Sequence, residues 1–256
     1  MTAQAAIATR ELAPAAVERE LRIQLAAAYR LVDRFGWTDS IYGHLTVRVP
    51  GPERHFLINP FGLAYDEVTA SNLVKIDCDG NIVGSSNYPI NRAGFVIHSA
   101  VHMIDEDSNI CVMHTHTRAG MAVAATAEGL QQLSQAATAF FGRISYHDYE
   151  GISLRLDERE RLVASLGGNR QMILKNHGLL TLGRSVPEAF MRLYLLEQAC
   201  RVQVDTGAAG TLAPMPDAVA RVSYDDMSLD TRDDVGQLEF AAWMRMLDRS
   251  DRGYRH

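Results

Sequence analysis

Apolar residues recur every three or four positions in several stretches of the chain, the spacing that buries one side of a helix. The first stretch covers residues 14–35 and is followed by Gly36, a residue typical of the position just after a helix. A second begins after Ser185, whose hydroxyl suits an N-cap, and runs to about residue 206. Shorter helices are predicted over residues 93–105, 118–127, 158–166 and 238–247.

Strands are predicted where apolar and polar residues alternate, or where a short apolar run lies between turn residues. Residues 42–49 and 55–58 flank a Pro-Gly-Pro turn and predict one hairpin, and Asp79-Gly80 predicts the turn of another. Two further predicted strands lie over residues 110–116 and 172–182, the second as a pair around a turn. Because no repeat or linker divides these elements, the pattern predicts one α/β domain with a mixed or antiparallel sheet between helices.

The composition narrows the kind of partner. Hydrophobic residues make up 47% of the 256 positions and charged residues 22%, as in ordinary globular proteins. The formal net charge is −6, and no run of five like charges interrupts the chain. Nucleic acids and anionic membranes usually require a basic surface, so we expect neither as a partner and expect a small-molecule substrate instead.

The cysteines and the N-terminal residues indicate the cellular compartment in which the protein is expected. The three cysteines show no C-x-x-C spacing and are predicted to be free thiols in a reducing compartment. No apolar stretch reaches the roughly 18 to 20 residues of a membrane span. Residues 1–14 lack a signal-peptide pattern and are predicted to be a disordered tip on a cytoplasmic protein.

Three histidines at strand ends give the first chemical signal. His114 and His116 occupy alternate positions, so their imidazoles share one face of the predicted strand. His177 stands at the end of another short apolar run, before Gly178. Any one of them alone would be interpreted as a hydrogen-bonded strand-end histidine. Together they predict a site for a metal ion with an open coordination position.

Further motifs carry a family resemblance over residues 15–210. The chain resembles the class II aldolase/adducin family, and within it the branch of the adducin head domain. The shared motifs, in chain order, are Gly43-His44-Leu45-Thr46, His55 to Gly62, Glu67-Val68-Thr69-Ala70-Ser71, Lys75 to Asn81, Ala93 to Ala100, His114-Thr115-His116, Tyr146 to Ile152 and Asn176-His177-Gly178.

The resemblance implies a fold and an assembly. The expected fold is a three-layer αβα arrangement with a central, largely antiparallel mixed sheet flanked by helices. Residues 15–210 would form the class II aldolase/adducin domain, and residues 211–256 a C-terminal extension packed on the same domain. The resemblance also implies a cyclic homotetramer with active sites between subunits.

The resemblance places His114, His116 and His177 on the three metal-ligand positions of the family. It therefore implies one divalent transition metal ion per subunit, with Zn or Fe expected first and Mn or Co as alternatives. In the family's aldolases a glutamate four residues before a helix histidine handles the proton, but here that position is Gly94. The usual acid/base group is therefore absent.

The phosphate-binding positions also depart from the family. Arg92 and Ala93 replace the serines that hold a sugar phosphate, and His44 replaces an asparagine of the neighbouring turn. We therefore expect a non-phosphorylated substrate. Arg92 could pair with a substrate carboxylate or form a salt bridge instead. Predicted substrate contacts are His44, Phe61, Gly62 and Arg92.

Replacements for the missing proton-handling group lie in the segment Tyr146-His147-Asp148-Tyr149. His147 is the first candidate because histidine titrates near neutral pH, and a structural role is the alternative. Tyr149 and Arg92 complete the predicted catalytic set. His98 and His102 share a helical face and are predicted to pack behind the ligands.

Three hypotheses on function follow from these residues. The first is a metal-dependent lyase, in which the metal acts as a Lewis acid in decarboxylation or retro-aldol cleavage of a small carboxylate or oxo substrate. The second is a non-haem Fe(II) oxygenase that uses the same three histidines. The third is a non-catalytic, adducin-like binding module.

Overall fold

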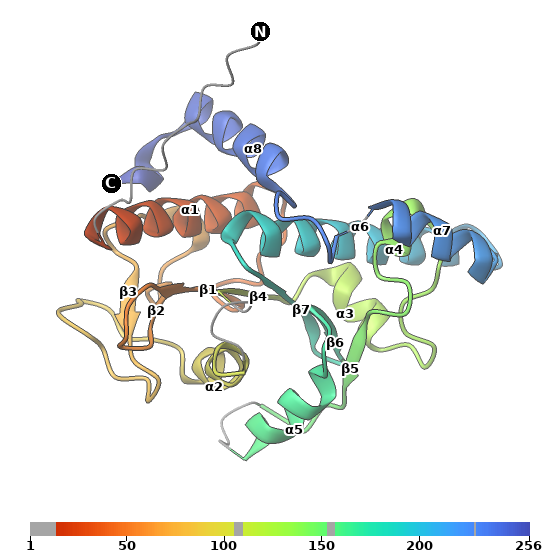
Figure 1. Ribbon diagram of the computed structural model, residues 1–256, viewed down its shortest axis with the longest axis horizontal. Helices are drawn as coiled ribbons and strands as arrows, with labels where there is room; N and C mark the ends of the chain where they lie inside the picture. The colour runs from red at the N-terminus through yellow and green to blue at the C-terminus, as the bar shows by residue number, and fades with distance from the viewer. Residues whose placement is uncertain (1–13, 105–109, 153–156, 228) are drawn as a thin grey trace, which may run out of the picture.

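The computed structural model describes residues 14–104, 110–152, 157–227 and 229–256 (Figure 1). A seven-stranded sheet runs through the middle of the molecule in the order β3-β2-β1-β4-β7-β6-β5. Every neighbouring pair is antiparallel except β5 and β6, which are parallel. The prediction of a largely antiparallel mixed sheet is confirmed. The strands are β1 (His44–Val49), β2 (His55–Ile58), β3 (Val74–Ile76), β4 (Cys111–Thr115), β5 (Ser145–His147), β6 (Gln171–Leu174) and β7 (Gly178–Gly183).

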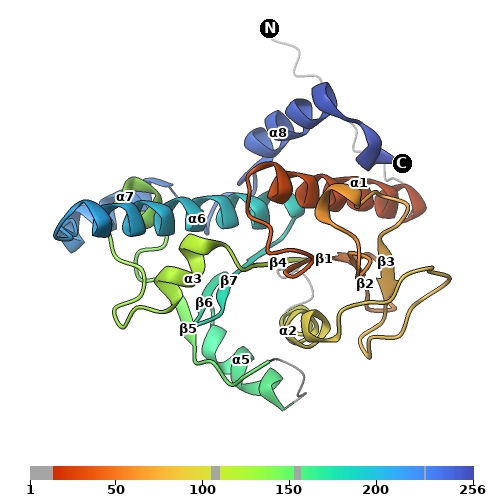
Figure 2. The ribbon, with the colours of Figure 1, turned by 180° about the vertical axis from the view of Figure 1, so that it is seen from behind.

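Helices cover both faces of this sheet (Figures 1 and 2). On one face lie α1 (Pro14–Arg34) and α6 (Val186–Ala209), and α8 (Gln237–Ser250) packs on both of them. On the other face lie α2 (Arg92–His102) and α5 (Glu158–Leu166). The remaining elements, near the β5 end or in loops, are α3 (Arg118–Ala124), α4 (Gln135–Thr138), α7 (Asp217–Met227) and the short 3₁₀ helices η1 (Tyr65–Glu67) and η2 (Gly253–Arg255).

The alternation of side chains along the strands divides the core between the two faces. In β4, Cys111 and Met113 join the large cluster beneath α1 and α6, whereas Val112 joins a cluster with residues of α2 and α5. The same parity puts His114 on the α2 face. In β1, His44 pairs with His114 and is therefore on that face too. The sheet thus separates an apolar side from a side that carries histidines.

Most predicted helices are observed close to their expected bounds. The hydroxyl of Ser185 accepts a hydrogen bond from the backbone N–H of Glu188, as expected of an N-cap. The second arm of the Asp79-Gly80 hairpin is shorter than predicted and reduces to one bridge between Ile76 and Ile82. The carboxylate of Asp77 accepts backbone N–H groups in this turn and so replaces part of the strand ladder.

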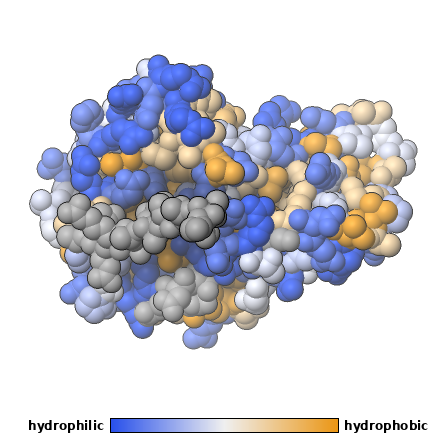
Figure 3. Space-filling view, turned by 45° about the horizontal axis from the view of Figure 1, so that its top comes forward, coloured by the Kyte–Doolittle hydropathy of each residue, from blue (hydrophilic) through white to orange (hydrophobic). Residues whose placement is uncertain are grey.

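The region after α6 contains a helix that the apolar pattern did not predict. Within α7 only Ala220 is buried, and its apolar residues Val219 and Val222 are exposed. Figure 3 shows hydrophobic residues gathered at the end of the molecule where α7 lies in Figure 1. None of the helices among the described residues is long and apolar enough to cross a membrane. The predicted disordered tip falls almost entirely on residues 1–13, and the predicted end of α2 at residue 105 also lies outside the described residues.

Candidate metal centre and active-site cavity

The neighbouring central strands β4 and β7 bring three histidines together at their ends. His114 is in β4 and His116 follows the strand, so both side chains point to the same face. The antiparallel pairing of β4 with β7 places Thr115 opposite Leu179. The turn before β7, which carries His177, therefore lies beside the end of β4.

Gly178 allows this close approach. A Cβ atom at this position would lie 2.4 Å from the carbonyl oxygen of Thr115 and 3.2 Å from Cδ2 of His116. Real Cβ atoms do not tolerate the first of these separations, so a larger residue would push the turn away from β4. The His-Gly pair of the sequence thus combines one potential ligand with the residue that brings it to the others.

The three imidazoles converge through the same ring atom. The Nε2 atom of His116 lies 2.8 Å from Nε2 of His114 and 3.0 Å from Nε2 of His177. On the opposite side of the rings, Nδ1 of His114 donates to the carbonyl oxygen of Leu179 at 2.9 Å. Nδ1 of His116 donates to the carboxylate of Asp39 at 3.0 Å. Because a neutral imidazole carries one N–H, the Nε2 atoms of these two rings present lone pairs.

The donor set fits a divalent transition metal ion. Lone pairs on nitrogens 2.8 Å apart repel each other unless a shared cation or proton lies between them. Three imidazole nitrogens are a common protein ligand set for Zn, Fe, Mn or Co, and they leave a position open for substrate. Fixing the Nδ1 hydrogen through a carbonyl or carboxylate is the usual way of orienting such a ligand.

Burial keeps the rings of His114 and His177 in the neutral form that binds metals. Loss of water around His114 lowers its pKa well below the ordinary value, and His177 and His116 lower it further. Burial also lowers the pKa of His177 to about 4, with a further contribution from His116. Both imidazoles are therefore neutral at physiological pH without a metal ion, and protons compete little for their lone pairs.

The three Nε2 atoms face a cavity of about 400 Å³. Its wall comes from β1, α2, β4 and the segments that follow β2, β5 and β6. The cavity is lined by Tyr42, His44, Phe61, Asn91, Gly94, Ile97, His114, His116, Tyr149, Gly151, Ile152 and His177. A small molecule in this space would contact the candidate metal site directly.

The sequence profile of the Class II Aldolase and Adducin N-terminal domain family matches residues 23–204. The chain belongs to this family. Among solved structures, an aldolase II superfamily protein from Pseudomonas syringae superposes with a TM-score of 0.88 at 48% identity, covering 97% of this chain and 99% of that one. The predicted membership of the class II aldolase/adducin family is confirmed, and so is the fold.

Two other relatives represent different branches of the family. The L-fuculose 1-phosphate aldolase from Glaciozyma antarctica superposes with a TM-score of 0.84 at 28% identity, covering 95% of each chain. Alpha-adducin from Rattus norvegicus is 42% identical over 256 residues, which cover 93% of this chain and 34% of adducin. The relatives of this chain therefore include both a protein named as an aldolase and alpha-adducin, so family membership alone does not identify a reaction.

Two departures of this chain from the class II aldolase pattern meet in the cavity wall. A Cβ atom on Gly94 would lie 2.3 Å from Cδ2 of His44, so the imidazole occupies the space over the glycine. His44 is 4% exposed, and its Nδ1 has no hydrogen-bond partner among the described residues. In the sequence, Gly94 and His44 are two separate departures from the family pattern. The structure shows that the His44 ring can occupy this place only because residue 94 has no side chain.

A second group of histidines lies behind this wall, between β1 and α2. The hydroxyl of Thr46 is 2.7 Å from Nδ1 of His98 and 2.7 Å from Nε2 of His102. His102 stacks on Phe56 with ring centroids 4.5 Å apart, and both histidines are buried. We call His98, His102 and Thr46 the Thr46 cluster. Its histidines do not line the metal cavity, in keeping with the packing role predicted for them.

The other predicted site residues lie at different distances from the cavity. Phe61 and Tyr149 line it, and the ring of Tyr149 is 6.0 Å from that of His177. Gly62 follows Phe61 and Arg92 follows Asn91 in the chain, but neither lines the cavity itself. Arg92 is exposed at the start of α2. The structure therefore brings Phe61 and Tyr149 to the three histidines, but leaves Arg92 at the surface beside Asn91.

His147 points away from the metal cavity. Its Nδ1 is 2.9 Å from the hydroxyl of Ser165. Its Nε2 faces carboxylates of Glu158 at 3.8 Å and Glu150 at 3.9 Å. A small cavity of about 10 Å³ touches both His147 and His177. His147 can therefore act on the metal site only through another group, and its predicted catalytic role stays a prediction.

Two carboxylates form hydrogen bonds at the end of β4 that carries the candidate ligands, and neither was predicted from the sequence. Asp39 accepts the hydrogen bond of His116, as described above. Glu197, in α6, accepts a hydrogen bond from the hydroxyl of Thr117, the residue after His116 and the N-cap of α3. Burial raises the pKa of Glu197 to about 7. Neither carboxylate is near the histidines in sequence, so no local pattern could reveal them.

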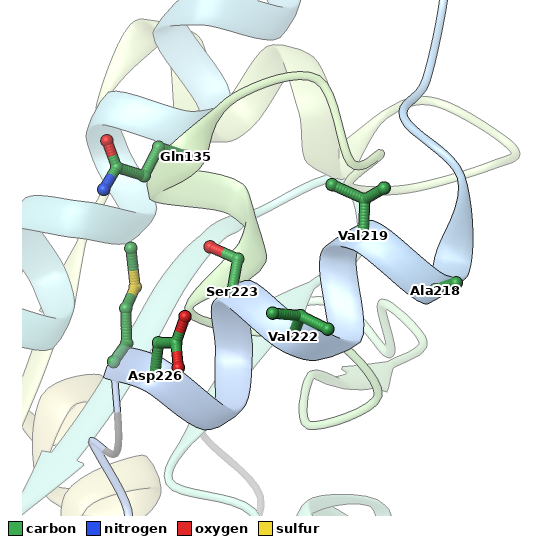
Figure 4. A pocket seen from close by; sticks show the side chains of 7 residues that line it. Gln135, Ala218, Val219, Val222, Ser223 and Asp226 are labelled. Carbon is green, nitrogen blue, oxygen red and sulfur yellow. The ribbon is translucent and has the colours of Figure 1, made fainter.

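A larger cavity, of about 580 Å³, lies elsewhere, between α4 and α7 (Figure 4). Its wall includes Val219, Val222 and Ser223, and Asp226 is the one ionisable residue among those that line it. No cluster of potential metal ligands is found there among the described residues, because the trio His114, His116 and His177 is the only such cluster identified. Size alone therefore does not mark this cavity as the reactive site.

Proposed function

We propose that the protein is a divalent-metal-dependent lyase that breaks a carbon–carbon bond, by decarboxylation or retro-aldol cleavage, in a small non-phosphorylated carboxylate or oxo substrate. The observation that carries this proposal is the convergence of three imidazole Nε2 atoms on one wall of a 400 Å³ cavity. Membership of the class II aldolase family, whose members are typically metal-dependent lyases, supports it. Zn or Fe suits the ligand set best, with Mn or Co as alternatives.

A divalent ion held by these three histidines would supply Lewis-acid polarisation of a substrate oxygen. Leu179 and Asp39 fix the orientation of two of the rings, so the lone pairs are aimed before substrate arrives. Cleavage of a bond to the carbon beside a carbonyl group leaves the electron pair on that carbon, delocalised onto the carbonyl oxygen, and the carbon must finally accept a proton. Tyr149, one of two tyrosines that line the cavity, has a hydroxyl suited to deliver it.

The composition of the wall supports a substrate without a phosphate group. Among the described residues that line the cavity there is no lysine, arginine, serine or threonine. Phosphates are usually held by such cationic and hydroxyl side chains, and what the described wall offers in their place is the N-terminus of α2, where Asn91 and Gly94 line the cavity. Arg92, at the surface beside Asn91, is retained as a candidate for a substrate carboxylate that reaches the mouth of the cavity.

The test begins with metal analysis of purified protein and of a His114→Ala/His116→Ala variant. We expect about one transition metal ion per wild-type chain and almost none in the variant. The wild type is then assayed without oxygen against small α-oxo, α-hydroxy and β-hydroxy acids, with release of CO₂ or of an aldehyde as the measurement. Turnover without oxygen supports the lyase. An absolute requirement for oxygen would replace it with the Fe(II) oxygenase.

The identity to alpha-adducin favours one alternative, a binding module without catalytic activity. In that case the histidine trio would be a structural device. The same metal analysis separates the two proposals: wild-type protein that takes up no more transition metal than the double variant would leave the binding module ahead.

A further inference from the structure

The cavity beside the three histidines is unusually poor in charge for a site that would hold a small polar substrate. Beyond the histidines and Asn91, the side chains that line it are aromatic or aliphatic. No acidic or basic residue other than histidine is found in the described part of its wall. A strongly charged body would lose water in this space without gaining a side chain of opposite charge, at a net cost.

The apolar side chains come from separate segments and surround the opening. Tyr42 precedes β1, Phe61 follows β2, and Tyr149 and Ile152 follow β5. Tyr42 is 49% exposed, Tyr149 51% and Ile152 73%, although large apolar side chains are usually covered. A group of such residues around a cavity marks a surface that a ligand, together with a neighbouring copy of the chain, can cover.

The inner wall suits a flat group. Gly94 contributes no side chain, and the His44 ring occupies the space above it, so this part of the wall is a planar imidazole. Phe61 and Tyr149 add further ring surfaces. Planar rings pack on one another in stacked or edge-to-face arrangements, which an apolar planar body could use here.

We propose that the substrate of this site joins two parts: a pair of oxygens that chelates the metal, as in an α-oxo or α-hydroxy acid, and an aromatic or branched apolar body. The chelating end occupies the open position beside His114, His116 and His177, and the body lies against Phe61, Tyr149 and Ile152. This substrate class rests on the proposed metal-dependent function. A cavity of about 400 Å³ is large enough for one ring and its chelating group.

The proposal is tested with three hydroxamates that share one chelating group and differ in the body attached to it. Acetohydroxamate carries a methyl group, benzohydroxamate a phenyl ring and phosphonoacetohydroxamate an anion. Their affinities for the Zn(II)-loaded protein are measured by titration calorimetry. We expect benzohydroxamate to bind at least about tenfold more tightly than acetohydroxamate, because the ring buries additional apolar surface. The phosphonate should gain nothing over acetohydroxamate.

Two variants show whether the preference comes from this wall. Phe61→Ala should weaken benzohydroxamate binding about fivefold or more and leave acetohydroxamate unchanged, since only the ring reaches residue 61. Val222→Ala is the matched control, because it trims an exposed apolar residue in the other cavity and should change neither affinity. Equal loss of both ligands in Phe61→Ala would overturn the placement of the apolar body.

The remaining outcomes separate this proposal from the proposed function. Metal-loaded protein that binds acetohydroxamate and benzohydroxamate equally, or that prefers the phosphonate, overturns the substrate class and leaves the metal site intact. Protein that retains no metal and binds none of the three hydroxamates overturns the proposed function, and the substrate class with it.

Discussion

The metal-site histidines and the Thr46 cluster are two groups of histidines on the same face of one sheet, and they differ in what their ring nitrogens face. In the Thr46 cluster one hydroxyl lies 2.7 Å from Nδ1 of His98 and 2.7 Å from Nε2 of His102, so it links the two rings, while Nε2 of His98 has no hydrogen-bond partner among the described residues. In the metal site the Nδ1 hydrogens of His114 and His116 point outward, and the Nε2 lone pairs are left facing each other. The position of the donors, and not the residue type, distinguishes a packing cluster from a metal site.

The largest expected effect comes from removing a metal ligand. His177→Ala should weaken metal binding by more than about 100-fold, because loss of an outer partner alone typically costs about 10- to 100-fold. Metal content after dialysis against a chelator measures it. The variant should still fold, since His177 is in the turn between β6 and β7 and not in a strand. Unchanged metal content would mean that His177 is not a metal ligand, and the proposed difference between a metal site and a packing cluster would then be wrong.

The reciprocal change is Thr46→Val, which keeps the shape of the side chain and removes the hydroxyl. Two buried imidazole nitrogens lose their partner, and each loss costs about 1–3 kcal/mol, so we expect about 2–6 kcal/mol less stability. Denaturant unfolding measures this change. Metal content should stay at the wild-type level. A stable Thr46→Val protein that loses its metal would show that the cluster serves the metal site.

Gly94→Ala examines the wall between the two groups. The new Cβ atom would stand 2.3 Å from the His44 ring, so the ring must move, at a cost of about 1–3 kcal/mol. Adding His44→Ala should recover most of this loss, because the space over residue 94 is then free. Unfolding free energies of the two single variants and the double variant form a cycle. Additive effects in that cycle would mean that the two positions are independent.

The smallest effect concerns Glu197, which supports the metal-binding strand end through Thr117. Burial raises its pKa to about 7, above the value of an unfolded glutamate, so the folded state binds the extra proton between roughly pH 4.5 and 7. Its contribution to stability is therefore complete at the acidic end of this range and is lost as the pH rises through 7.

Glu197→Gln should remove this dependence and keep the acceptor for Thr117. The difference in unfolding free energy between variant and wild type should thus grow in favour of the variant from pH 5 to pH 8. Thermal unfolding of metal-free protein across that range provides the measurement. A difference that does not change with pH would show that Glu197 is already ionised at pH 5.

Several features of the site could be predicted from local sequence. Alternation placed His114 and His116 on one face, and the Asn-His-Gly run marked a turn with a third histidine. The lyase rests on analogy, the metal ion on the pattern of three histidines and the role of His147 on the titration range of histidine, and all three remain proposals. The orientation of His147 toward Ser165 depends on the packing of α5, which the sequence around residue 147 does not encode.

The sequence by itself determined most of the elements, a mixed or antiparallel sheet and the three histidines, because these depend on periodicity and short motifs. Only the tertiary structure decided that three Nε2 atoms meet, that Leu179 and Asp39 orient two of the rings, and that His44 fills the space over Gly94. Each of these contacts joins residues that are distant in the chain. Their relative positions follow from strand pairing and helix packing, which no local pattern of residue types specifies.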